Sequence, residues 1–369
     1  MSVRDAILSF RDRMLTSPTF IRHAKRFPPT RVFARKNARA LFHICAGFVY
    51  SQILLGCVQA NVFESLGSGP KSAEELAGAA NLSPDAMARL LRAAVALRLL
   101  DGRGDGRFGL GPLGAAMISN PSIASMVIHH QRLYADLADP LALLRSGGRD
   151  SAMSDYWPYA SRRDPKDLSS AETAPYTALM AHSQTMISEE ILDAISIRRF
   201  RRLADIGGGN GAFIRAAREN SPATEFVLFD LPAVIDDARS RFEAADLGKT
   251  IHLTQGSFFD DDFPVGADAI TLIRIIHDHD DDAALTILRK AHAALPPGGT
   301  LIVAEPFAEV SGAEPIGDAY FGFYLLAMGS GKPRTRRSLI SMIEAAGFST
   351  VRHIPTKLSI LVSILDARK

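Results

Sequence analysis

Residues 203–211 have the sequence Leu-Ala-Asp-Ile-Gly-Gly-Gly-Asn-Gly, a short apolar segment that runs directly into a cluster of glycines. The apolar segment predicts a buried strand, and the residues that follow, 212–220, have the spacing of a helix. Glycines between a strand and a helix permit a tight turn and let a ligand approach the backbone. The segment therefore predicts an α/β fold with a ligand site at its first loop.

Strands and helices alternate after this loop. Strands are predicted over 203–206, 226–229, 251–253, 269–273 and 301–304, with helices over 212–220, 233–245 and 281–295. This alternation indicates a doubly wound, Rossmann-like parallel sheet with helices on both faces. The tail differs, because a helix over 338–346 precedes two strands, 350–354 and 359–365, which we expect to form a terminal antiparallel pair.

The N-terminal third of the chain has a helical pattern that ends in a hairpin. Helices are predicted over 40–66, from a capping box at 72–75, and over 83–99, before a turn at 101–107 and a strand at 108–110. This order is typical of a winged-helix domain. A DNA-binding regulator is the alternative that this order raises. Its candidate recognition helix is rich in Ala and Leu and has only Arg89, Arg92 and Arg98 as basic residues, so we expect no nucleic-acid partner.

Length and composition limit the other classes of protein. A chain of 369 residues favours two domains, and 47% hydrophobic with 22% charged residues is ordinary globular composition. The net charge of +2 disfavours a nucleic-acid binder. Cys45 and Cys57 lack metal-ligand spacing, which favours reduced cytoplasmic thiols. We see no signal peptide, and the longest apolar stretches, such as 46–60, are interrupted by Gly, Ser and Gln and are too short to span a membrane. We therefore expect a soluble or surface-attached protein.

Residues 1–40, which we call the basic arm, carry most of the positive charge. The arm has ten basic and two acidic residues, a net charge of +8, interleaved with Phe10, Phe20, Phe27 and Phe33. A basic segment that also bears aromatic residues suits contact with an anionic membrane surface. The alternative is a solvated arm that packs on a dimer partner.

Two acidic residues frame the glycine loop. Asp230 ends the next predicted strand, 19 residues after Gly211, where a carboxylate accepts hydrogen bonds from both ribose hydroxyls of an adenosine. The loop also satisfies the loose G-x-G-x-x-G/A spacing of nicotinamide-cofactor sites, which leaves that alternative. Asp205, two residues before the first glycine, suits an amino group, and glycines at every second position favour S-adenosylmethionine, with S-adenosylhomocysteine as product.

His277 follows the strand over 269–273, at the carboxyl edge where doubly wound folds place their sites. Neutral imidazole, with an ordinary pKa of about 6.5, is available near neutral pH to take the proton of a substrate hydroxyl. We therefore expect His277 to be a general base. Of the four aspartates that could cap the next helix, Asp278, Asp280, Asp281 and Asp282, the last three are expected mainly to do so. Together with His277 and His279, these acids would also offer ligands for a metal.

Four segments together resemble the two-domain small-molecule O-methyltransferases of the caffeate and acetylserotonin type: LADIGGGNGAF, FVLFDLPAVI, GSFFDDDFP, and the run from IRIIHDHDDD to LIVAEP. The resemblance spans residues 45–369. It implies an N-terminal domain that forms an intertwined homodimer, and catalysis without a metal. It also implies that His277 is the base of an H-D-W motif, here H-D-H with His279, and that Glu305 orients it. Pro333 replaces the second acid of caffeate-type enzymes, so we expect one orienting acid.

The same resemblance assigns the cofactor site. The glycine loop would hold the methionine end and Asp230 the ribose, Ser257 and Phe258 would flank the adenine, and Arg274 would lie on the cofactor side. Many relatives have an acid at the position of Ser257. The complete predicted set is Asp205, Gly207, Gly208, Gly209, Gly211, Asp230, Leu231, Ser257, Phe258 and Arg274.

The acceptor pocket is predicted from aromatic residues in the segment 318–328. Phe321, Tyr324 and Met328, together with Met180, suit a large apolar substrate, and the alternative is an ordinary core helix. The arm and the segment GDAYFGFYLLAMGSGKPRT resemble the demethylspheroidene (hydroxyneurosporene) O-methyltransferases of purple photosynthetic bacteria. This implies methylation of a tertiary hydroxyl on an acyclic carotenoid. A bacteriochlorophyllide methyltransferase and a phenol or polyketide O-methyltransferase are the close alternatives.

Four parts are therefore predicted along the chain. They are the basic arm (1–40), a winged-helix-like dimerisation domain (41–120), a helical linker and substrate-pocket segment (121–195) and an S-adenosylmethionine-binding methyltransferase domain (196–369). We expect a cytoplasmic homodimer that contacts the photosynthetic (inner) membrane peripherally through the arm.

Overall fold

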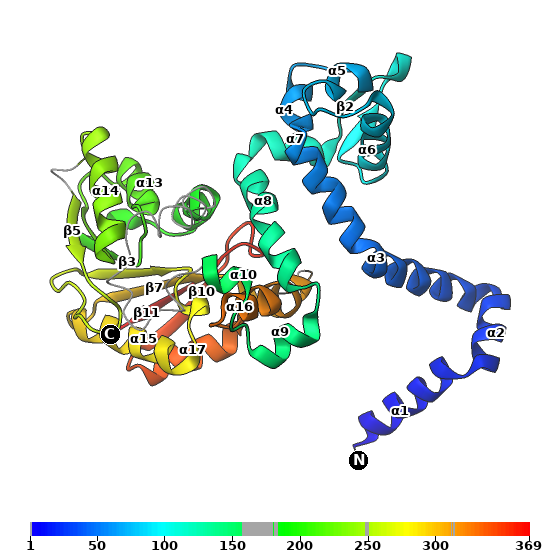
Figure 1. Cartoon of the computed structure of the whole chain (residues 1–369). Coiled ribbons are helices and arrows are strands. Elements are labelled where there is room, and N and C mark those ends of the chain that lie inside the picture. The colour runs from blue at the N-terminus through cyan, green and yellow to red at the C-terminus, as the bar shows by residue number, and fades with distance from the viewer. Residues whose placement is uncertain (1, 157–179, 181–183, 248–250, 311, 313) are drawn as a thin grey trace. The chain divides into compact units, whose positions relative to one another are not determined.

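The computed structural model describes residues 2–156, 180, 184–247, 251–310, 312 and 314–369. The chain forms two compact units, Met1–Asn120 and Pro121–Lys369, and each is described by itself. Figure 1 shows the helices and strands with the labels used below.

The first unit confirms the winged-helix pattern. A capping box between Ser72 and Glu75 begins α5, and the strands β1 and β2 pair antiparallel as the predicted hairpin. Met87, Leu91 and Leu100 form part of its core and are fully buried. The elements in order are α1 (Val3–Thr16), α2 (Pro18–Arg26), α3 (Pro28–Gln59), α4 (Val62–Gly67), α5 (Ala73–Ala77), α6 (Pro84–Ala96), β1 (Leu100–Gly102), β2 (Phe108–Leu110) and α7 (Pro112–Ser119).

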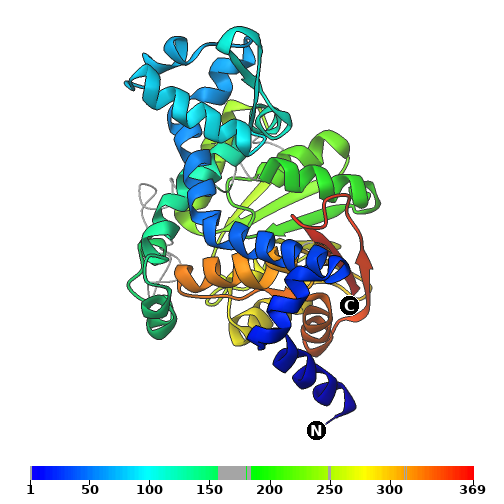
Figure 2. The same cartoon turned by 90° about the vertical axis from the view of Figure 1, so that its right-hand side faces the viewer.

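The long helix α3 differs from the prediction at both ends. It begins at Pro28, since proline suits the first turn of a helix, and it ends at Gln59 because Asn61 adopts a left-handed φ of 50°. Figure 2 shows its uninterrupted course. By length and composition alone α3 is able to cross a membrane, with a mean hydropathy of 1.8 over its most apolar window, so the expectation that no stretch is long enough was wrong. A mostly buried core helix of a soluble protein and a signal sequence meet the same criterion, and 11% of this window is buried.

A seven-stranded sheet organises the second unit. Its order is β10-β11-β7-β6-β3-β4-β5, in which β7, β6, β3, β4 and β5 run parallel while β11 is antiparallel to both β7 and β10. The predicted doubly wound sheet with a terminal antiparallel pair is thereby confirmed. The strands are β3 (Arg202–Ile206), β4 (Glu225–Asp230), β5 (Ile251–Gln255), β6 (Ala269–Ile273), β7 (Thr300–Glu305), β10 (Ser349–Ile354) and β11 (Ser363–Arg368).

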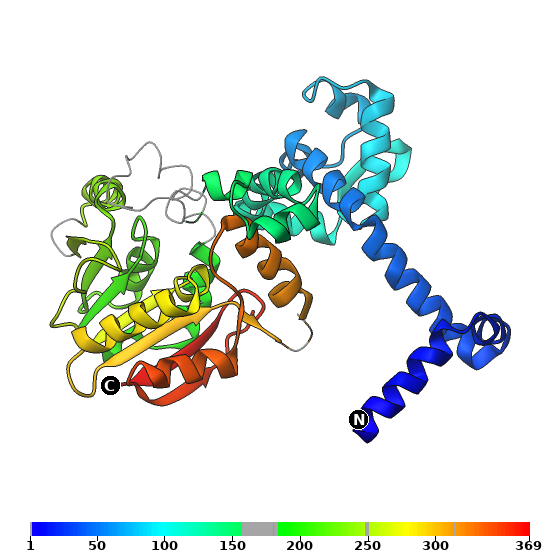
Figure 3. The same ribbon diagram turned by 60° about the horizontal axis from the view of Figure 1, so that its bottom comes forward.

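Helices cover both faces of the sheet. One face packs against α15 (Asp281–Ala294) and α17 (Arg336–Ala345), which lie side by side in Figure 3. The other packs against α13 (Ala212–Asn220), α14 (Pro232–Ala244) and a helix over 184–194. Because apolar residues on both faces are buried, the parallel strands have continuous apolar sequences. All five residues of β6 are buried.

The other helices and strands of this unit either precede the core in the sequence or lie between β7 and α17. They are α8 (Pro121–Asp136), α9 (Pro140–Ser146), α10 (Ala152–Tyr156), a π-helical segment (Pro315–Phe321), α16 (Gly322–Met328) and the short pair β8 (Phe307–Ala308) and β9 (Arg334–Thr335). The predicted strand over 359–365 was wrong at its start. Residues 357–361 form a turn, in which Leu361 N donates to Leu358 O, and β11 begins only at Ser363. Trp157 and His182 lie outside the described residues.

Candidate active site

A cavity opens at the carboxyl ends of the central parallel strands. The ends of three strands line it, with Asp205 from β3, Asp230 from β4 and Ile273 from β6. The strand order brings these ends together at one edge of the sheet. This is the edge at which doubly wound folds bind ligands. The cavity is lined by Met180, Gln184, Asp205, Gly207, Gly208, Gly209, Asn210, Ala212, Asp230, Leu231, Val234, Gly256, Ser257, Phe258, Phe259, Ile273, Arg274, Ile275, Asp278 and His279.

The glycine loop forms a floor of bare backbone, in which Gly207 and Gly208 have no space for a side chain. Gly207 has a φ of +72°, and a Cβ on it would lie 2.5 Å from Ile275 Cδ1 and 2.7 Å from Phe258 Cζ. A Cβ on Gly208 would collide with the Asp205 carboxylate. Gly211, with a φ of +77°, is not among the described residues that line the cavity, and the Phe242 ring occupies the space of its absent Cβ. Gly211 therefore serves the turn into α13, whereas Gly207 and Gly208 keep the floor open.

Asp205 offers a buried carboxylate oxygen to the cavity. Its Oδ1 accepts a hydrogen bond of 2.6 Å from Thr271 Oγ1, whereas Oδ2 has no hydrogen-bond partner within the described part of the chain. Burial raises the pKa of this carboxyl to about 7, and the nearby Asp230 carboxylate contributes to the increase. An unpartnered buried carboxylate oxygen is costly, and a cationic ligand would relieve that cost.

Asp230 is held at the tip of β4 by backbone donors. Its Oδ2 accepts from Gly209 N at 2.8 Å and its Oδ1 accepts from Leu231 N at 2.8 Å. Burial raises its pKa to about 6, although both hydrogen bonds oppose the increase. These bonds fix the carboxylate beside the glycine loop, so Asp205 and Asp230 lie on adjacent strands of one cavity.

Ser257 and Phe258 form the wall after β5. Ser257 is buried, and its Oγ accepts from Phe259 N at 3.2 Å while its own N–H donates to Asp261. The Phe258 ring makes edge contacts with His279 and Phe263. A fixed aromatic ring on a cavity wall suits a flat heterocycle.

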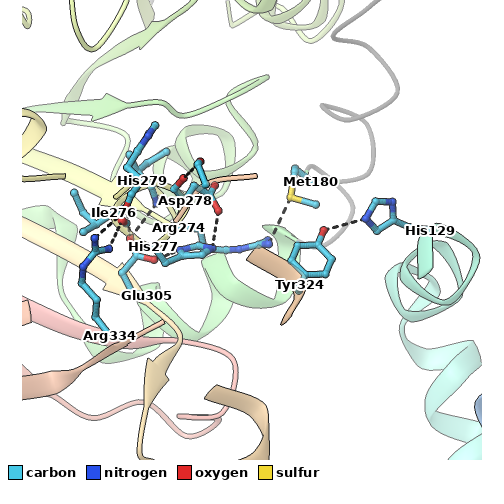
Figure 4. Close-up of polar contacts among 12 residues, drawn as sticks. His129, Met180, Arg274, Ile276, His277, Asp278, His279, Glu305, Tyr324 and Arg334 are labelled. Carbon is cyan, nitrogen blue, oxygen red and sulfur yellow. Dashed lines mark hydrogen bonds and ion pairs between the residues drawn. The ribbon is translucent and has the colours of Figure 1, made fainter. Parts of the chain in front are cut away.

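Arg274 and Met180 meet across the cavity. The Arg274 Nη2 donates to Met180 Sδ at 3.5 Å, and Figure 4 shows the two side chains pointing toward one another. Arg274 has a φ of +56°, a conformation that L side chains rarely adopt, and its N–H donates to Ala304 O of β7. Strained backbone of this kind persists where the surroundings impose it, and often at functional sites.

His277 lies between two carboxylates in the turn Ile276–Asp278. Its Nδ1 is bonded to Glu305 Oε2, and its Nε2 lies 3.1 Å from Asp278 Oδ1. Glu305 also accepts from Ile275 N at 3.0 Å and Ile276 N at 2.7 Å through Oε1, so one carboxylate orients both the ring and the turn (Figure 4). The sequence predicted one orienting acid, Glu305; in the structure the Asp278 carboxylate also lies beside the second ring nitrogen.

The two carboxylates set the proton affinity of the ring. Burial by itself would lower the pKa of His277, but the charges of Asp278 and Glu305 outweigh it and raise this pKa above the ordinary value. Burial raises the pKa of Asp278 to about 6, against the opposing effect of His277. A histidine with a raised pKa is a stronger base in its neutral form.

His279 has different surroundings. Its ring packs against the edges of Phe258 and Phe259, and burial lowers its pKa to about 4. A neutral imidazole of such low basicity is a poor proton acceptor. The two histidines therefore differ in basicity, since the pKa of His277 is raised and that of His279 is lowered.

Arg334 binds the backbone on both sides of His277. This buried guanidinium donates to Ile276 O at 2.6 Å and to His279 O at 2.7 Å, and it forms an ion pair with Asp281 at 2.8 Å. The preceding loop adds two contacts, from Lys332 N to His277 O and from Ser330 Oγ to Asp278 O. This role of Arg334 was not predicted from the sequence, because the bonds join residues more than 50 positions apart and no local motif marks them.

The four residues predicted to line the acceptor pocket differ from one another in their surroundings. Met180 lines the cavity, and the Phe321 ring lies 6.1 Å from the His277 ring. Tyr324 is buried, and its hydroxyl is hydrogen-bonded to His129 of α8 at 2.9 Å (Figure 4). Met328 is buried in the cluster of α16 with Leu133, Leu143 and Met153, as the core-helix alternative describes. Among the described residues, no three His, Cys, Asp or Glu side chains form a group suited to a metal.

The fold and the site together define a class, the S-adenosylmethionine-dependent methyltransferases, and comparison with known proteins gives the family. A family model described as "O-methyltransferase domain" matches residues 152–349, and one described as "O-methyltransferase dimerisation domain" matches residues 42–120. The chain belongs to this family of O-methyltransferases, and the nicotinamide-cofactor and DNA-binding alternatives are set aside.

Individual relatives agree with this assignment. The chain is 39% identical over 349 residues to demethylspheroidene O-methyltransferase of Cereibacter sphaeroides, covering 93% of this chain and 90% of the relative. It is 37% identical over 368 residues to the Rhodobacter capsulatus enzyme of the same name, covering 100% and 91%. The solved structure of human N-acetylserotonin methyltransferase in complex with S-adenosylmethionine has a similar fold, with a TM-score of 0.74, 23% identity, and coverage of 90% and 97%.

Proposed function

We propose that this enzyme transfers a methyl group from S-adenosylmethionine to the tertiary hydroxyl of an acyclic hydroxycarotenoid, with His277 as general base. The observation that carries the proposal is the 39% identity, over 93% of the chain, to a demethylspheroidene O-methyltransferase. The proposal includes a homodimer formed through residues 42–120 and a location in the cytoplasm at the photosynthetic (inner) membrane.

The cavity fits S-adenosylmethionine on two observations. The unpartnered Asp205 Oδ2 suits the methionine ammonium group, and the glycine loop presents bare backbone, since a Cβ on Gly207 or Gly208 would collide with side chains around the cavity. Asp230 is held where it would accept the ribose hydroxyls, and Ser257 and Phe258 would flank the adenine. When bound, S-adenosylmethionine supplies an electrophilic methyl group; no metal is part of the proposal.

His277 supplies the proton acceptor. With its Nδ1–H donated to Glu305, neutral His277 presents Nε2 as the basic nitrogen. The acceptor hydroxyl gives its proton to Nε2, and the resulting imidazolium lies between the carboxylates of Glu305 and Asp278. A tertiary alcohol is a weak acid, so stabilisation of the protonated ring by two carboxylates has a direct effect on the rate.

The acceptor would approach past aromatic residues. Phe321 contacts the His277 ring, and Tyr320 stacks on Tyr324 with ring centroids 5.7 Å apart. The two tyrosine hydroxyls are hydrogen-bonded to ring nitrogens of α8, Tyr324 to His129 and Tyr320 to His130. An apolar wall of this kind suits a polyene better than a charged acceptor.

The experiment is methyl transfer from labelled S-adenosylmethionine to detergent-dispersed hydroxyneurosporene, with a catechol and a chlorophyllide as parallel acceptors. We expect label in the carotenoid. Label only in another acceptor would preserve the methyltransferase assignment and refute the carotenoid substrate. Cofactor binding measured on the same preparation separates an inactive protein from a wrong acceptor.

A further inference from the structure

We propose that the basic arm, which comprises α1, α2 and the first turns of α3, is a docking surface for an anionic lipid bilayer. The arm consists of three consecutive helices at the N-terminal end (Figures 1 and 2). Contacts join α1 to α2 and α2 to α3. The link between this surface and an apolar acceptor rests on the proposed function, whereas the lipid contact rests on the arm alone.

Helix α1 has the pattern of a helix that lies in a membrane interface. Val3, Ile7 and Phe10 recur at helical spacing on one face, with exposed fractions of 80%, 64% and 60%. Asp5 and Asp12, seven residues apart, share the opposite face. An apolar stripe with the acidic residues turned away from it is suited to partial burial among lipid headgroups.

The rest of the arm repeats this combination of apolar and cationic residues. Phe27, between α2 and α3, and Phe33 are 60% and 70% exposed. Arg31, Arg35 and Arg39 recur every four residues and form a basic row along the start of α3, and all three are exposed. Exposed aromatic side chains beside arginines match the two components of an anionic bilayer surface, the acyl boundary and the phosphates.

Charge separation along the chain favours a bilayer as the occupant. The arm has a net charge of +8, whereas the whole chain has a net charge of +2. Residues 41–369 therefore have a net charge of 2 − 8, or −6. An anionic surface would attract the arm and repel the remainder, which gives the bound enzyme one orientation. The dimerisation-domain match covers residues 42–120, and the arm lies outside this match.

The test is flotation of the full chain with vesicles of phosphatidylcholine alone or of phosphatidylcholine with phosphatidylglycerol in equal amounts. We expect binding to the anionic vesicles that high salt reverses, and little binding to the neutral ones. Arg31→Gln/Arg35→Gln/Arg39→Gln should weaken binding by roughly a hundredfold, because each arginine near an anionic surface contributes roughly fivefold. Phe10→Ser/Phe33→Ser should also weaken it.

The matched control is Arg89→Gln/Arg92→Gln/Arg98→Gln, which removes three exposed arginines in and just after α6 of the same unit. This control should bind as the wild-type chain does. Equal binding to both vesicle types, or equal loss in the arm and control variants, would overturn the proposal. So would an arm variant that keeps lipid binding but changes the oligomeric mass, because that result would assign the arm to a second copy. Neither cofactor nor acceptor is needed, so the outcome is independent of the proposed reaction.

Discussion

Replacing Arg334 by methionine removes the guanidinium that holds the His277 turn while keeping a side chain of similar length. Two hydrogen bonds to backbone carbonyls are lost, those to Ile276 O and His279 O. Hydrogen bonds to charged groups contribute about 1.5–3 kcal/mol each, so the loss of two should lower the free energy of unfolding by about 3–6 kcal/mol. The ion pair with Asp281 adds little, because the Asp281 side chain is 52% exposed.

Loss of these two hydrogen bonds should also lower the turnover rate, because they hold the turn that positions His277. A misplacement of about 1 Å at a reacting group costs roughly a hundredfold in rate, so we expect a loss of turnover of that order. Affinity for S-adenosylmethionine should change much less, because Asp205 and Asp230 are held by β3 and β4 rather than by this turn.

Urea unfolding, turnover and calorimetric cofactor binding on the same preparations test this reasoning. Arg334→Lys keeps the charge but cannot reach both carbonyls, so it should fall between the wild type and Arg334→Met and remain folded. Asp281→Asn is the matched control, and it should lose less than about 1 kcal/mol. An Arg334→Met variant with wild-type stability and turnover would refute the argument, as would an equal loss in Asp281→Asn.

Three further predictions follow from the buried charges and the glycine floor. Asp278→Asn removes a charge that raises the pKa of His277, so the acidic limb of the kcat/KM profile should move to lower pH; an unchanged midpoint would contradict the assignment. The ligand-free pKa of Asp205 is about 7, so cofactor affinity should weaken as the pH falls through that value, and Asp205→Asn should remove this dependence in calorimetry. Gly207→Ala should abolish cofactor binding because its Cβ would meet Ile275 and Phe258, and retained affinity in a folded variant would show that the floor is not where the ligand lies.

Local patterns predicted the fold because its strands are buried on both faces. Strand β6 begins and ends where its apolar run does, at Ala269 and Ile273, and the glycine loop was placed by residue type alone. The start of α3 was missed because the basic residues after Pro28 interrupt the apolar periodicity without interrupting the helix. The turn before Ser363 was missed because its residues are as apolar as those of a strand.

The polar contacts of the site were only partly predictable. Residue type and position in the sequence were enough to predict that one edge of the sheet carries Asp205, Asp230, His277 and Glu305. The contact of Asp278 with His277 depends on how a three-residue turn is folded, and that of Arg334 on a bond across 58 positions. Neither leaves a periodic or compositional trace, since both are set by tertiary packing.

The most direct measurement is turnover of His277→Ala with labelled S-adenosylmethionine and the dispersed hydroxycarotenoid, with cofactor affinity determined on the same preparation. General base catalysis contributes about a hundredfold to ten-thousandfold, so turnover should fall within that range while the dissociation constant of the cofactor stays close to that of the wild type. Turnover equal to that of the wild-type enzyme would remove His277 from the reaction.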